Sequence, residues 1–534
     1  MRLLPALCWL TATLGVCVSA PGPKFYPDDP LVREPPPIRV EDARARKISD
    51  VYDLFSHVLA TPGEKQSAVK RIPAGDVNTL GEVLEGAWYQ MRHYRSRMSL
   101  AELAAAPGAG KPPSTTGSWT VVSAKSEGIT PGFVIEDDAK RRYFLKFDPP
   151  RSPELATAAD VISSKFFYAL GYHVPENFIV HFERARLKVS DRAKFRDTRG
   201  EVRKLTSKDV SEIMLKAPQA GDGAYRATAS LFLPGKILNE YRYYGTRADD
   251  PNDIVSHEHR RSLRGLHVFC AWLDHDDSRS INTLDSLVEE NGQKFVKHYL
   301  LDFGSTLGSA SSGPNSPRSG FEPFFTWTSS AKEFFSLGLF VPAWARIRYP
   351  EQPAIGRFSA EQFEPRTWTP EYPNPAFRNR LPEDEFWAAR QVMHFTDDEI
   401  RAIVASGQYS RREDADYMTS VLIRRRDAIG KAYLSKPLQL DRFRVENGEV
   451  RFEDLAVKHG FSPARRYSYA WSEYNNATGD LRPIAGSTDA RVPATSAPYL
   501  AMAITHGNES PKLTIYLRQV SGRFSLVGID RASN

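Results

Sequence analysis

Cysteine and long hydrophobic runs are both scarce in this sequence. Of its three cysteines, Cys8 and Cys17 lie in the apolar N-terminal segment, and Cys270 is the only one in the remainder. That remainder cannot close an internal disulfide, so its stability must come from a hydrophobic core, which a chain of 534 residues can supply. Beyond residue 20 no apolar stretch has the length needed to cross a bilayer, so we expect no transmembrane segment there.

An excess of charge of one sign is also nearly absent. The chain has 71 Lys and Arg residues against 65 Asp and Glu residues, a net charge of +6, and the basic residues are spread along it. Surfaces that bind nucleic acid concentrate basic residues on one face or in one run, so we expect no nucleic-acid partner. A hydrophobic content of 41% and a charged content of 25% exclude a fully disordered chain, a collagen and a coiled-coil rod.

Residues 1–20 have the layout of a secretory signal peptide. Arg2 gives a positive start, Leu3 to Val18 is apolar, and Val18-Ser19-Ala20 offers small residues for cleavage. A membrane anchor is disfavoured because the run is short, and a lipoprotein box at Leu14 to Cys17 is disfavoured because Val16 is bulky. We therefore expect an exported protein that is periplasmic, envelope-associated or secreted.

Residues 21–118 are expected to form an extended and helical N-terminal extension with a linker. The first part, to residue 40, is rich in proline, and residues 41–105 have a polar, helical pattern. The linker, Ala106 to Ser118, is rich in Gly, Pro, Ser and Thr. We expect one apolar stripe on the helical part, made of Val51, Leu54, Phe55 and Val58.

From Trp119 the pattern changes to strands interrupted by helices. Strands are predicted at Thr120–Ser123, Gly132–Ile135, Tyr143–Phe147, Phe178–Phe182, Tyr225–Leu233, and, as a hairpin around Asn291-Gly292, at Thr283–Val288 and Lys294–Leu301. Helices are predicted at Pro153–Leu170 (ended by Gly171), Asp209–Lys216, His257–Leu273, and several times within residues 383–434. Cys270 lies inside an apolar helical run and is expected to be a buried structural thiol.

The last part of the chain, residues 455–534, is predicted to be a small β-rich module. Leu513, Ile515 and Leu517 alternate with polar residues, and Ser521-Gly522 gives a turn before the next strand.

Lys146 lies in a predicted strand, and Glu154 follows it at the start of the next helix. A cation fixed in a strand and oriented by a carboxylate can bind phosphate groups. The same two residues can also be an ordinary strand lysine and a glutamate that stabilises a helix N-terminus.

The segment from Asp274 to Asn282 carries the second part of the pattern. Asp277 and Asn282 are five residues apart, the interval between a catalytic aspartate and a metal-binding asparagine in a phosphotransferase loop. Arg279 stands where a cation could contact a transferred phosphate. Because Asp274 and Asp276 are so close, either of them could be the base in place of Asp277.

Asp302-Phe303-Gly304 is the third part, and it directly follows the second strand of the predicted hairpin. A carboxylate there can hold magnesium against phosphates, and a glycine lets the chain turn away sharply.

In this order, the residues resemble a family of atypical protein kinases typified by the bacterial HipA toxins, the spore-coat kinase CotH and the secreted Golgi casein kinase. The similarity covers roughly residues 119–435 and is carried mainly by Tyr143–Asp148 and Leu301–Gly304. It implies an α+β fold with a two-lobed, protein-kinase-like core: a β-rich N-lobe at 119–236 and a helical C-lobe at 237–435.

The resemblance also implies roles for single residues. Lys146 would bind the phosphates of ATP, Glu154 would pair with Lys146, and Asp277 would act as base. Asn282 and Asp302 would bind Mg²⁺. The acceptor would be a hydroxyl group, with a protein acceptor favoured over a sugar or a small molecule.

The chain departs from the kinase pattern at several points. It has no Gly-x-Gly-x-x-Gly loop, and Gly128 and Gly132 are the candidates for covering the phosphates, although a plain β-turn explains them equally well. It also lacks a His-Arg-Asp tripeptide, with His275 two residues before Asp277 instead, and no Ala-Pro-Glu follows Asp302. These departures fit an atypical enzyme, and they equally fit an exported pseudokinase that acts as a binding or scaffold protein.

Overall fold

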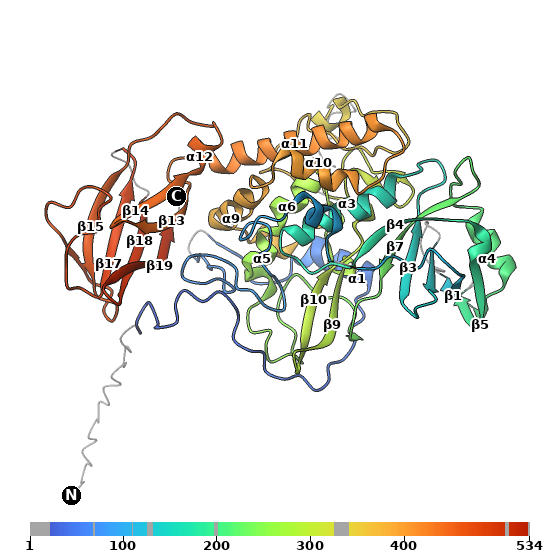
Figure 1. Ribbon diagram of the computed structural model, residues 1–534, viewed down its shortest axis with the longest axis horizontal. Coiled ribbons are helices and arrows are strands. Elements are labelled where there is room, and N and C mark those ends of the chain that lie inside the picture. Colours follow the sequence, from blue (N-terminus) through green and yellow to red (C-terminus); the bar gives the residue numbers. More distant parts are fainter. Residues whose placement is uncertain are drawn as a thin grey trace, which may run out of the picture. The chain divides into compact units, whose positions relative to one another are not determined.

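The computed structural model describes residues 22–67, 70–108, 110–124, 132–196, 201–324, 341–507 and 512–531. The chain divides into two compact units (Figure 1). The larger unit comprises Leu31–Asp441 and Glu453–Arg466. The smaller unit comprises Arg442–Phe452, Tyr467–Ala532 and the N-terminal stretch that ends at Pro30.

A seven-stranded sheet organises the first part of the larger unit, with the strand order β4-β7-β3-β2-β1-β5-β6. Neighbouring strands are antiparallel except for β1 and β5, which are parallel. The strands are β1 (Trp119–Ala124), β2 (Gly132–Glu136), β3 (Arg142–Phe147), β4 (Asn177–Phe182), β5 (Leu187–Arg196), β6 (Val202–Lys204) and β7 (Tyr225–Leu231). The strands predicted in this region are confirmed.

The side-chain alternation of β3 decides which residues face the sheet's hydrophobic core. Tyr143, Leu145 and Phe147 are buried in that core. Lys146 lies between two of them in sequence and therefore points to the opposite face. In the register of the sheet, Lys146 stands between Gly132 of β2 and Thr228 of β7.

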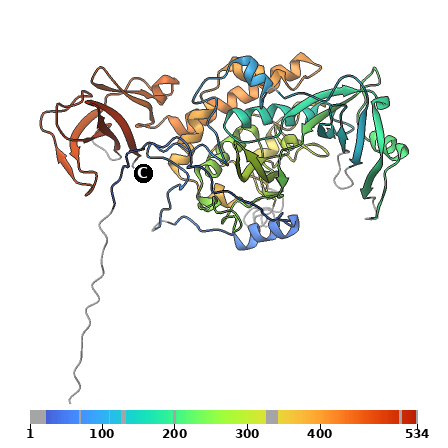
Figure 2. The same cartoon turned by 60° about the horizontal axis from the view of Figure 1, so that its bottom comes forward.

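Helix α3 (Leu155–Ala169) connects this sheet to the helices of the larger unit (Figures 1 and 2). Its start is fixed by Asp148, whose carboxylate accepts hydrogen bonds from Thr157 N at 2.8 Å and Thr157 Oγ1 at 2.9 Å. Its end is followed by Gly171, which adopts a φ of 115°, a conformation that only glycine accepts without strain. The predicted helix and its terminating glycine are confirmed.

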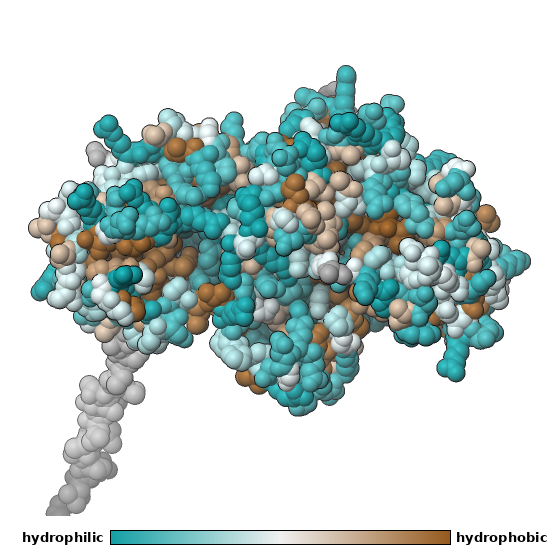
Figure 3. Space-filling model, in the orientation of Figure 1, coloured by the Kyte–Doolittle hydropathy of each residue, from teal (hydrophilic) through white to brown (hydrophobic). Residues whose placement is uncertain are grey.

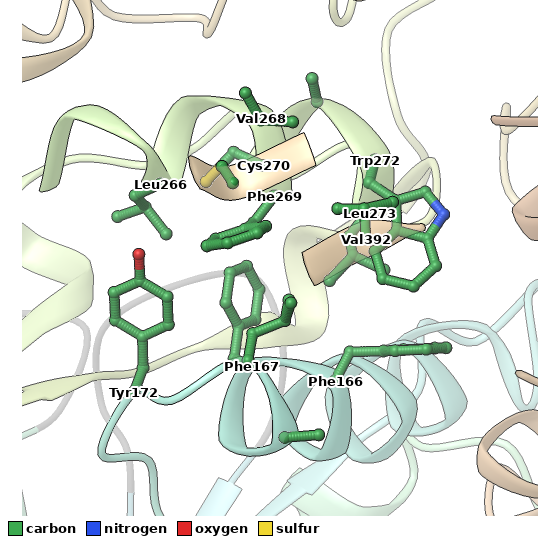
Figure 4. Packing of buried hydrophobic residues seen from close by; sticks show 14 of the residues in the cluster. Phe166, Phe167, Tyr172, Leu266, Val268, Phe269, Cys270, Trp272, Leu273 and Val392 are labelled. Atoms are coloured by element: carbon green, nitrogen blue, oxygen red, sulfur yellow. The ribbon is translucent and has the colours of Figure 1, made fainter. Parts of the chain in front are cut away.

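The main hydrophobic core of the larger unit lies between α3 and α6 (Leu266–Leu273). Figure 4 shows Phe166 and Phe167 of α3 facing the aromatic side chains of α6. Phe166 and Trp272 meet edge to face, with ring centroids 4.7 Å apart. Cys270 of α6 is fully buried, and burial raises the pKa of its thiol, so the expected structural thiol is confirmed.

The helical pattern expected over His257–Leu273 is broken into three short pieces, a 3₁₀ turn (His257–His259), α5 (Arg261–Arg264) and α6. The other helices are α4 (Ser207–Met214), α8 (Pro375–Arg378), α9 (Pro382–Val392), α10 (Asp397–Ala405), α11 (Arg412–Leu434) and α12 (Leu455–Lys458). Further 3₁₀ turns lie at Arg184–Arg186, Ser280–Asn282, Phe303–Ser305 and Ala343–Arg346. None of the helices in the described ranges combines the length and the apolar character needed to span a membrane.

A hairpin of β9 (Thr283–Glu290) and β10 (Gln293–Leu300) forms a small sheet with β8 (Lys236–Ile237). Asn291 and Gly292 both have positive φ, 51° and 76°, as a two-residue hairpin turn with the right twist requires. The predicted hairpin is therefore confirmed. Strands β11 (Ser309–Ala310) and β12 (Gly313–Pro314) form a short ladder after it.

The helical pattern expected over residues 41–105 is largely wrong. The described part of this range contains only α1 (Asp50–Phe55), a π-helix (Ser56–Ala60) and α2 (Leu100–Ala105). The apolar stripe is not a core face either, because Val51 and Phe55 are 64% and 57% exposed. The polar residues Asp53 and His57 are the buried ones, since the side of the helix that carries them is packed against the protein.

The smaller unit is built on a five-stranded antiparallel sheet with the order β16-β15-β17-β18-β19. Its strands are β15 (Ser468–Tyr474), β16 (Leu481–Pro483), β17 (Tyr499–Thr505), β18 (Leu513–Val520) and β19 (Arg523–Arg531), and β13 (Leu440–Glu446) pairs with β14 (Glu449–Asp454). The predicted alternation and the turn at Ser521-Gly522 are confirmed. Hydrophobic residues gather on the face of this sheet seen in Figure 3. On one of its faces Phe25 packs on Tyr474 and Tyr516.

The overall class is thus α+β, as expected, with one large sheet and a helical layer in the larger unit. Its description as a two-lobed kinase core stays a prediction.

Substitution Gly171→Ala is expected to destabilise the larger unit. A Cβ at this position would lie 2.2 Å from the ring of Tyr89, and the positive φ adds backbone strain. We expect a loss of about 2 kcal/mol or more, read as a lower midpoint of thermal unfolding. The control is Gly221→Ala, where no atom lies within 4 Å of the added Cβ. Equal midpoints for the two variants would contradict this account of the helix end.

Candidate functional site

Three elements that are far apart in the sequence bring one lysine and two aspartates together. Lys146 Nζ of β3 lies 2.7 Å from Asp302 Oδ1 and 3.6 Å from Asp160 Oδ2. Asp160 belongs to α3, and Asp302 follows β10 in a left-handed conformation with a φ of 55°. Burial acts to lower the pKa of Lys146, but the two carboxylates outweigh it and raise this pKa, so the lysine is a cation.

The predicted ion pair between Lys146 and Glu154 is wrong. Glu154 has a φ of 67° just before α3, and its Oε2 accepts a hydrogen bond of 2.9 Å from the backbone N–H of Ser410. The carboxylate that faces Lys146 from the helix is Asp160, six residues further along. Glu154 precedes the helix in a left-handed conformation, and its carboxylate bonds to Ser410 instead of Lys146.

Asp160 also positions the segment that carries Asp302. Its Oδ1 accepts hydrogen bonds from Phe303 N at 3.1 Å and from Asn177 Nδ2 at 3.3 Å. Burial raises the pKa of Asp160, and the charge of Lys146 opposes this. The sequence held a signal for this residue, because Asp160 and Lys165 are the only charged residues within α3. A carboxylate in a buried helix needs a partner.

Asp277 and Asn282 form the second cluster of the site. Asn282 Nδ2 donates to Asp277 Oδ2 at 2.9 Å and to the backbone oxygen of Asp277 at 2.6 Å. Arg279 Nε donates to Asp277 Oδ1, and the Arg279 guanidinium stacks on the ring of Tyr372, 4.1 Å from its centroid. Burial raises the pKa of Asp277, while Arg279 and Asn282 act to lower it.

The other two acids of the loop are held in structural contacts. Asp274 ends α6 and accepts a hydrogen bond of 2.9 Å from Trp368 Nε1. Asp276 accepts hydrogen bonds from Asn315 Nδ2 at 3.0 Å and from Ser319 Oγ at 2.6 Å. Of the three aspartates that the sequence left open, Asp277 is therefore the one whose contacts best suit a base.

The two clusters are joined through the backbone of the hairpin. The pairing of β9 and β10 ends at Thr283 and Leu300, and it continues as a hydrogen bond of 2.9 Å from Leu301 N to Asn282 O. Asn282 thus lies beside the residue that precedes Asp302. The carboxylates of Asp302 and Asp277 also interact electrostatically, because the charge of Asp302 acts to raise the pKa of Asp277. Of the predicted site residues, Lys146, Asp277, Arg279, Asn282 and Asp302 form one chain of contacts.

The two predicted phosphate-covering glycines have different outcomes. Gly128 lies outside the described residues. Gly132 is part of β2, and a Cβ there would lie 2.8 Å from the backbone oxygen of Leu145, so the sheet itself requires glycine. Its predicted role in binding phosphates stays a prediction.

A pocket opens directly at the lysine and the two aspartates. Besides these three, it is lined by Phe147, Ala156, Thr157, Thr228, Gly304, Ser305 and Ser311. It offers a cation and several hydroxyl groups, which suit phosphate oxygens.

Asp302, which lines this pocket, and Asn282, whose backbone bonds to the residue before Asp302, carry oxygen atoms that fit a hard divalent cation. The carboxylate of Asp302 and the amide oxygen of Asn282 are the donors that Mg²⁺ prefers. In the ranges that the structure describes, no three His, Cys, Asp or Glu side chains converge as a metal centre. A metal at this site would take only two protein ligands, with the remainder from phosphates and water, as is usual for Mg²⁺ in phosphotransferases.

Substitutions Asp160→Asn and Glu154→Gln are expected to separate the observed lysine partner from the predicted one. Asp160→Asn keeps the acceptor for Phe303 N but removes a charge beside Lys146, so the dissociation constant of Mg-ATP should rise about tenfold, or about 1.4 kcal/mol. Glu154→Gln keeps the bond to Ser410 and should change it less than about twofold. Calorimetric titration measures both. A larger loss in Glu154→Gln would overturn the assignment.

Comparison with known proteins gives a limited result. No family model matches the chain, and no curated protein matches it. Two crystal structures of the Golgi casein kinase are similar to it, one of them with Mn/ADP bound. Their sequence identities are 9% and 10%, their TM-scores 0.30 and 0.31, and each covers 60% of this chain and 73% or 74% of its own. Similarity at this level carries no argument about function, and the resemblance to HipA and CotH stays a prediction.

Proposed function

We propose that the chain is an exported, Mg²⁺- and ATP-dependent phosphotransferase of the atypical kinase type. The observation that carries the proposal is the single chain of contacts from Lys146 through Asp302 to the Asn282–Asp277 pair. It combines a cation for phosphates, two oxygen ligands for a metal and a carboxylate that can accept a proton. A protein hydroxyl is the acceptor that the family resemblance favours.

Different side chains bind the phosphates and the metal ion. Lys146 binds phosphate oxygens, and Asp160 holds the ammonium group in place from α3. Asp302 and Asn282 hold Mg²⁺, which when bound neutralises phosphate charge. Ser305 and Ser311 line the same pocket.

Asp277 is the proposed base of the transfer step. Its carboxylate takes the proton of the acceptor hydroxyl, the acceptor oxygen forms a bond to the γ-phosphorus, and the bond from that phosphorus to the ADP oxygen breaks. Asn282 and Arg279 hold the Asp277 carboxylate by hydrogen bonds, so its orientation is set before the acceptor arrives. Arg279 also supplies a positive charge for the phosphoryl group that is transferred.

Export is inferred from the sequence alone. It rests on the sequence pattern of residues 1–20, which lie outside the described residues.

Substitutions Asp302→Asn and Asp277→Asn are expected to separate binding from chemistry. Asp302→Asn removes the negative charge of a proposed metal ligand, so Mg²⁺-dependent ATP binding, measured by calorimetry, should weaken at least about tenfold. Asp277→Asn should leave ATP binding intact and slow phosphoryl transfer about 10²- to 10⁴-fold. Absence of Mg²⁺-dependent ATP binding in the wild type would refute the proposal. Binding without transfer to any hydroxyl acceptor would instead identify a pseudokinase-like binding protein.

The pH dependence of transfer should report the environment of Asp277. A base works only when deprotonated, so the rate should fall as the pH falls through the pKa of Asp277, which burial raises above the usual value of about 3.9. Arg279→Gln removes a charge that lowers this pKa, so the acid limb of the pH–rate profile should move to higher pH. Arg424→Gln, a change on an exposed face of α11, is the control. An unmoved acid limb in Arg279→Gln would exclude Asp277 as the titrating base.

A further inference from the structure

A second pocket of the larger unit lies between the π-helix and the start of α8. One wall is formed by His57, Thr61, Pro62, Lys65 and Gln66, and the other by Pro373, Pro375, Arg378 and Asn379. Gln66 ties the walls together, because its backbone N–H donates to Asn379 Oδ1 at 2.7 Å and its side chain donates to Asn379 O at 3.3 Å. The enclosed volume is about 260 Å³, which is ample for a small polyatomic group.

The lining of this pocket carries charge of one sign. Lys65 and Arg378 line it together with the imidazole of His57, whose pKa burial lowers, and none of the residues that line it is acidic. Burial alone acts on the pKa of Arg378 and lowers it, with no acidic group acting in the opposite direction. A half-enclosed site with cations and no carboxylate favours an anionic ligand.

His57 contributes a buried polar atom without a partner. The residue is only 2% exposed, and within the described residues its Nε2 has no hydrogen-bond partner. Its Nδ1 faces Asp53 Oδ2 at 3.7 Å, which leaves Nε2 as the ring nitrogen that a ligand in the pocket could bond. Leaving a buried imidazole nitrogen unbonded costs free energy, which a ligand in the pocket would recover. The residue also sits in a π-helix, a feature often found at functional sites.

Both walls of the pocket reach the loop that carries Asp277. On the α8 side, Asn374 Nδ2 donates to Ser278 O at 3.1 Å, and the preceding Tyr372 stacks with Arg279. On the other side, Asp53 of α1 faces His57, and the positive charge of Arg279 acts on the pKa of Asp53, which burial raises. Through these contacts the residues around the pocket are linked to the loop of the proposed base.

We propose that this pocket, the oxyanion pocket, binds a phosphate, sulfate or carboxylate group, with Arg378 and Lys65 as the cations and His57 Nε2 as a hydrogen-bond donor in its Nε2–H tautomer. The group that this pocket holds would be part of the acceptor, so the acceptor is a hydroxyl compound that also bears an oxyanion. That acceptor role rests on the proposed phosphotransferase function, whereas oxyanion binding by the pocket does not.

The test is a calorimetric titration of the purified protein, without nucleotide, with inorganic phosphate, inorganic sulfate and acetate as separate probes. At least one anion should bind, and the three arms tell phosphate-like from carboxylate-like ligands. Arg378→Gln and His57→Gln should each weaken that binding tenfold or more. Arg378 lies near the surface, so its variant keeps the test valid if the buried His57 variant does not fold. Arg424→Gln on α11 is the matched control and should bind as the wild type does.

Lys146→Gln separates this pocket from the proposed nucleotide site, because an anion held by Lys146 would be lost in that variant. Retained phosphate binding in Lys146→Gln and its loss in Arg378→Gln support the oxyanion pocket. The reverse pattern, or no binding of any of the three anions, overturns it. Mg-ATP titrations of the same proteins keep the two hypotheses apart. If anion binding depends on Arg378 but the protein does not bind ATP, only the phosphotransferase is refuted. If ATP binding depends on Asp302 but anion binding is unchanged in Arg378→Gln, only the pocket is refuted.

Discussion

The ion pair between Lys146 and Asp302 is the interaction on which the rest of the candidate site depends. It joins β3 to the end of the β9–β10 hairpin, and Asp160 adds α3 through its contact with the same lysine. The pair can form only if α3 begins where Asp148 fixes it and if the hairpin ends in register with Asn282. A half-buried lysine is tolerated here because two carboxylates compensate its charge.

Buried polar contacts also hold the loop around Asp277 in place. Asp274 and Asp276 accept hydrogen bonds from the segment after β12, so these two carboxylates anchor that segment to the end of α6. Asp277 is left to Asn282 and Arg279, which fix its orientation. Three adjacent acids thus have different roles because each meets different donors, and pre-oriented groups are what a transfer reaction requires.

Much of the fold could be read from periodicity. The strands β1 to β3, helix α3 with Gly171, and the hairpin at Asn291-Gly292 all have local signals strong enough to fix their positions. The helical prediction for residues 41–105 failed because a helical pattern does not show which face of a helix packs against the protein. In α1 and the π-helix, the face with Asp53 and His57 is buried instead of the apolar stripe. Tertiary packing overrides a weak local preference of that kind.

For the site, the sequence by itself determined the residue types and their order: a strand lysine, an acidic loop with Asp277 and Asn282, and Asp302 after a strand. Only the tertiary structure decided which carboxylate meets Lys146, because Asp160 and Glu154 are both near in sequence and only the direction of each side chain separates them. It also decided which donors meet each acid of the loop: Trp368 meets Asp274, Asn315 meets Asp276, and Asn282 and Arg279 meet Asp277. Spacing along a chain fixes neighbours within an element, whereas partners between elements depend on packing.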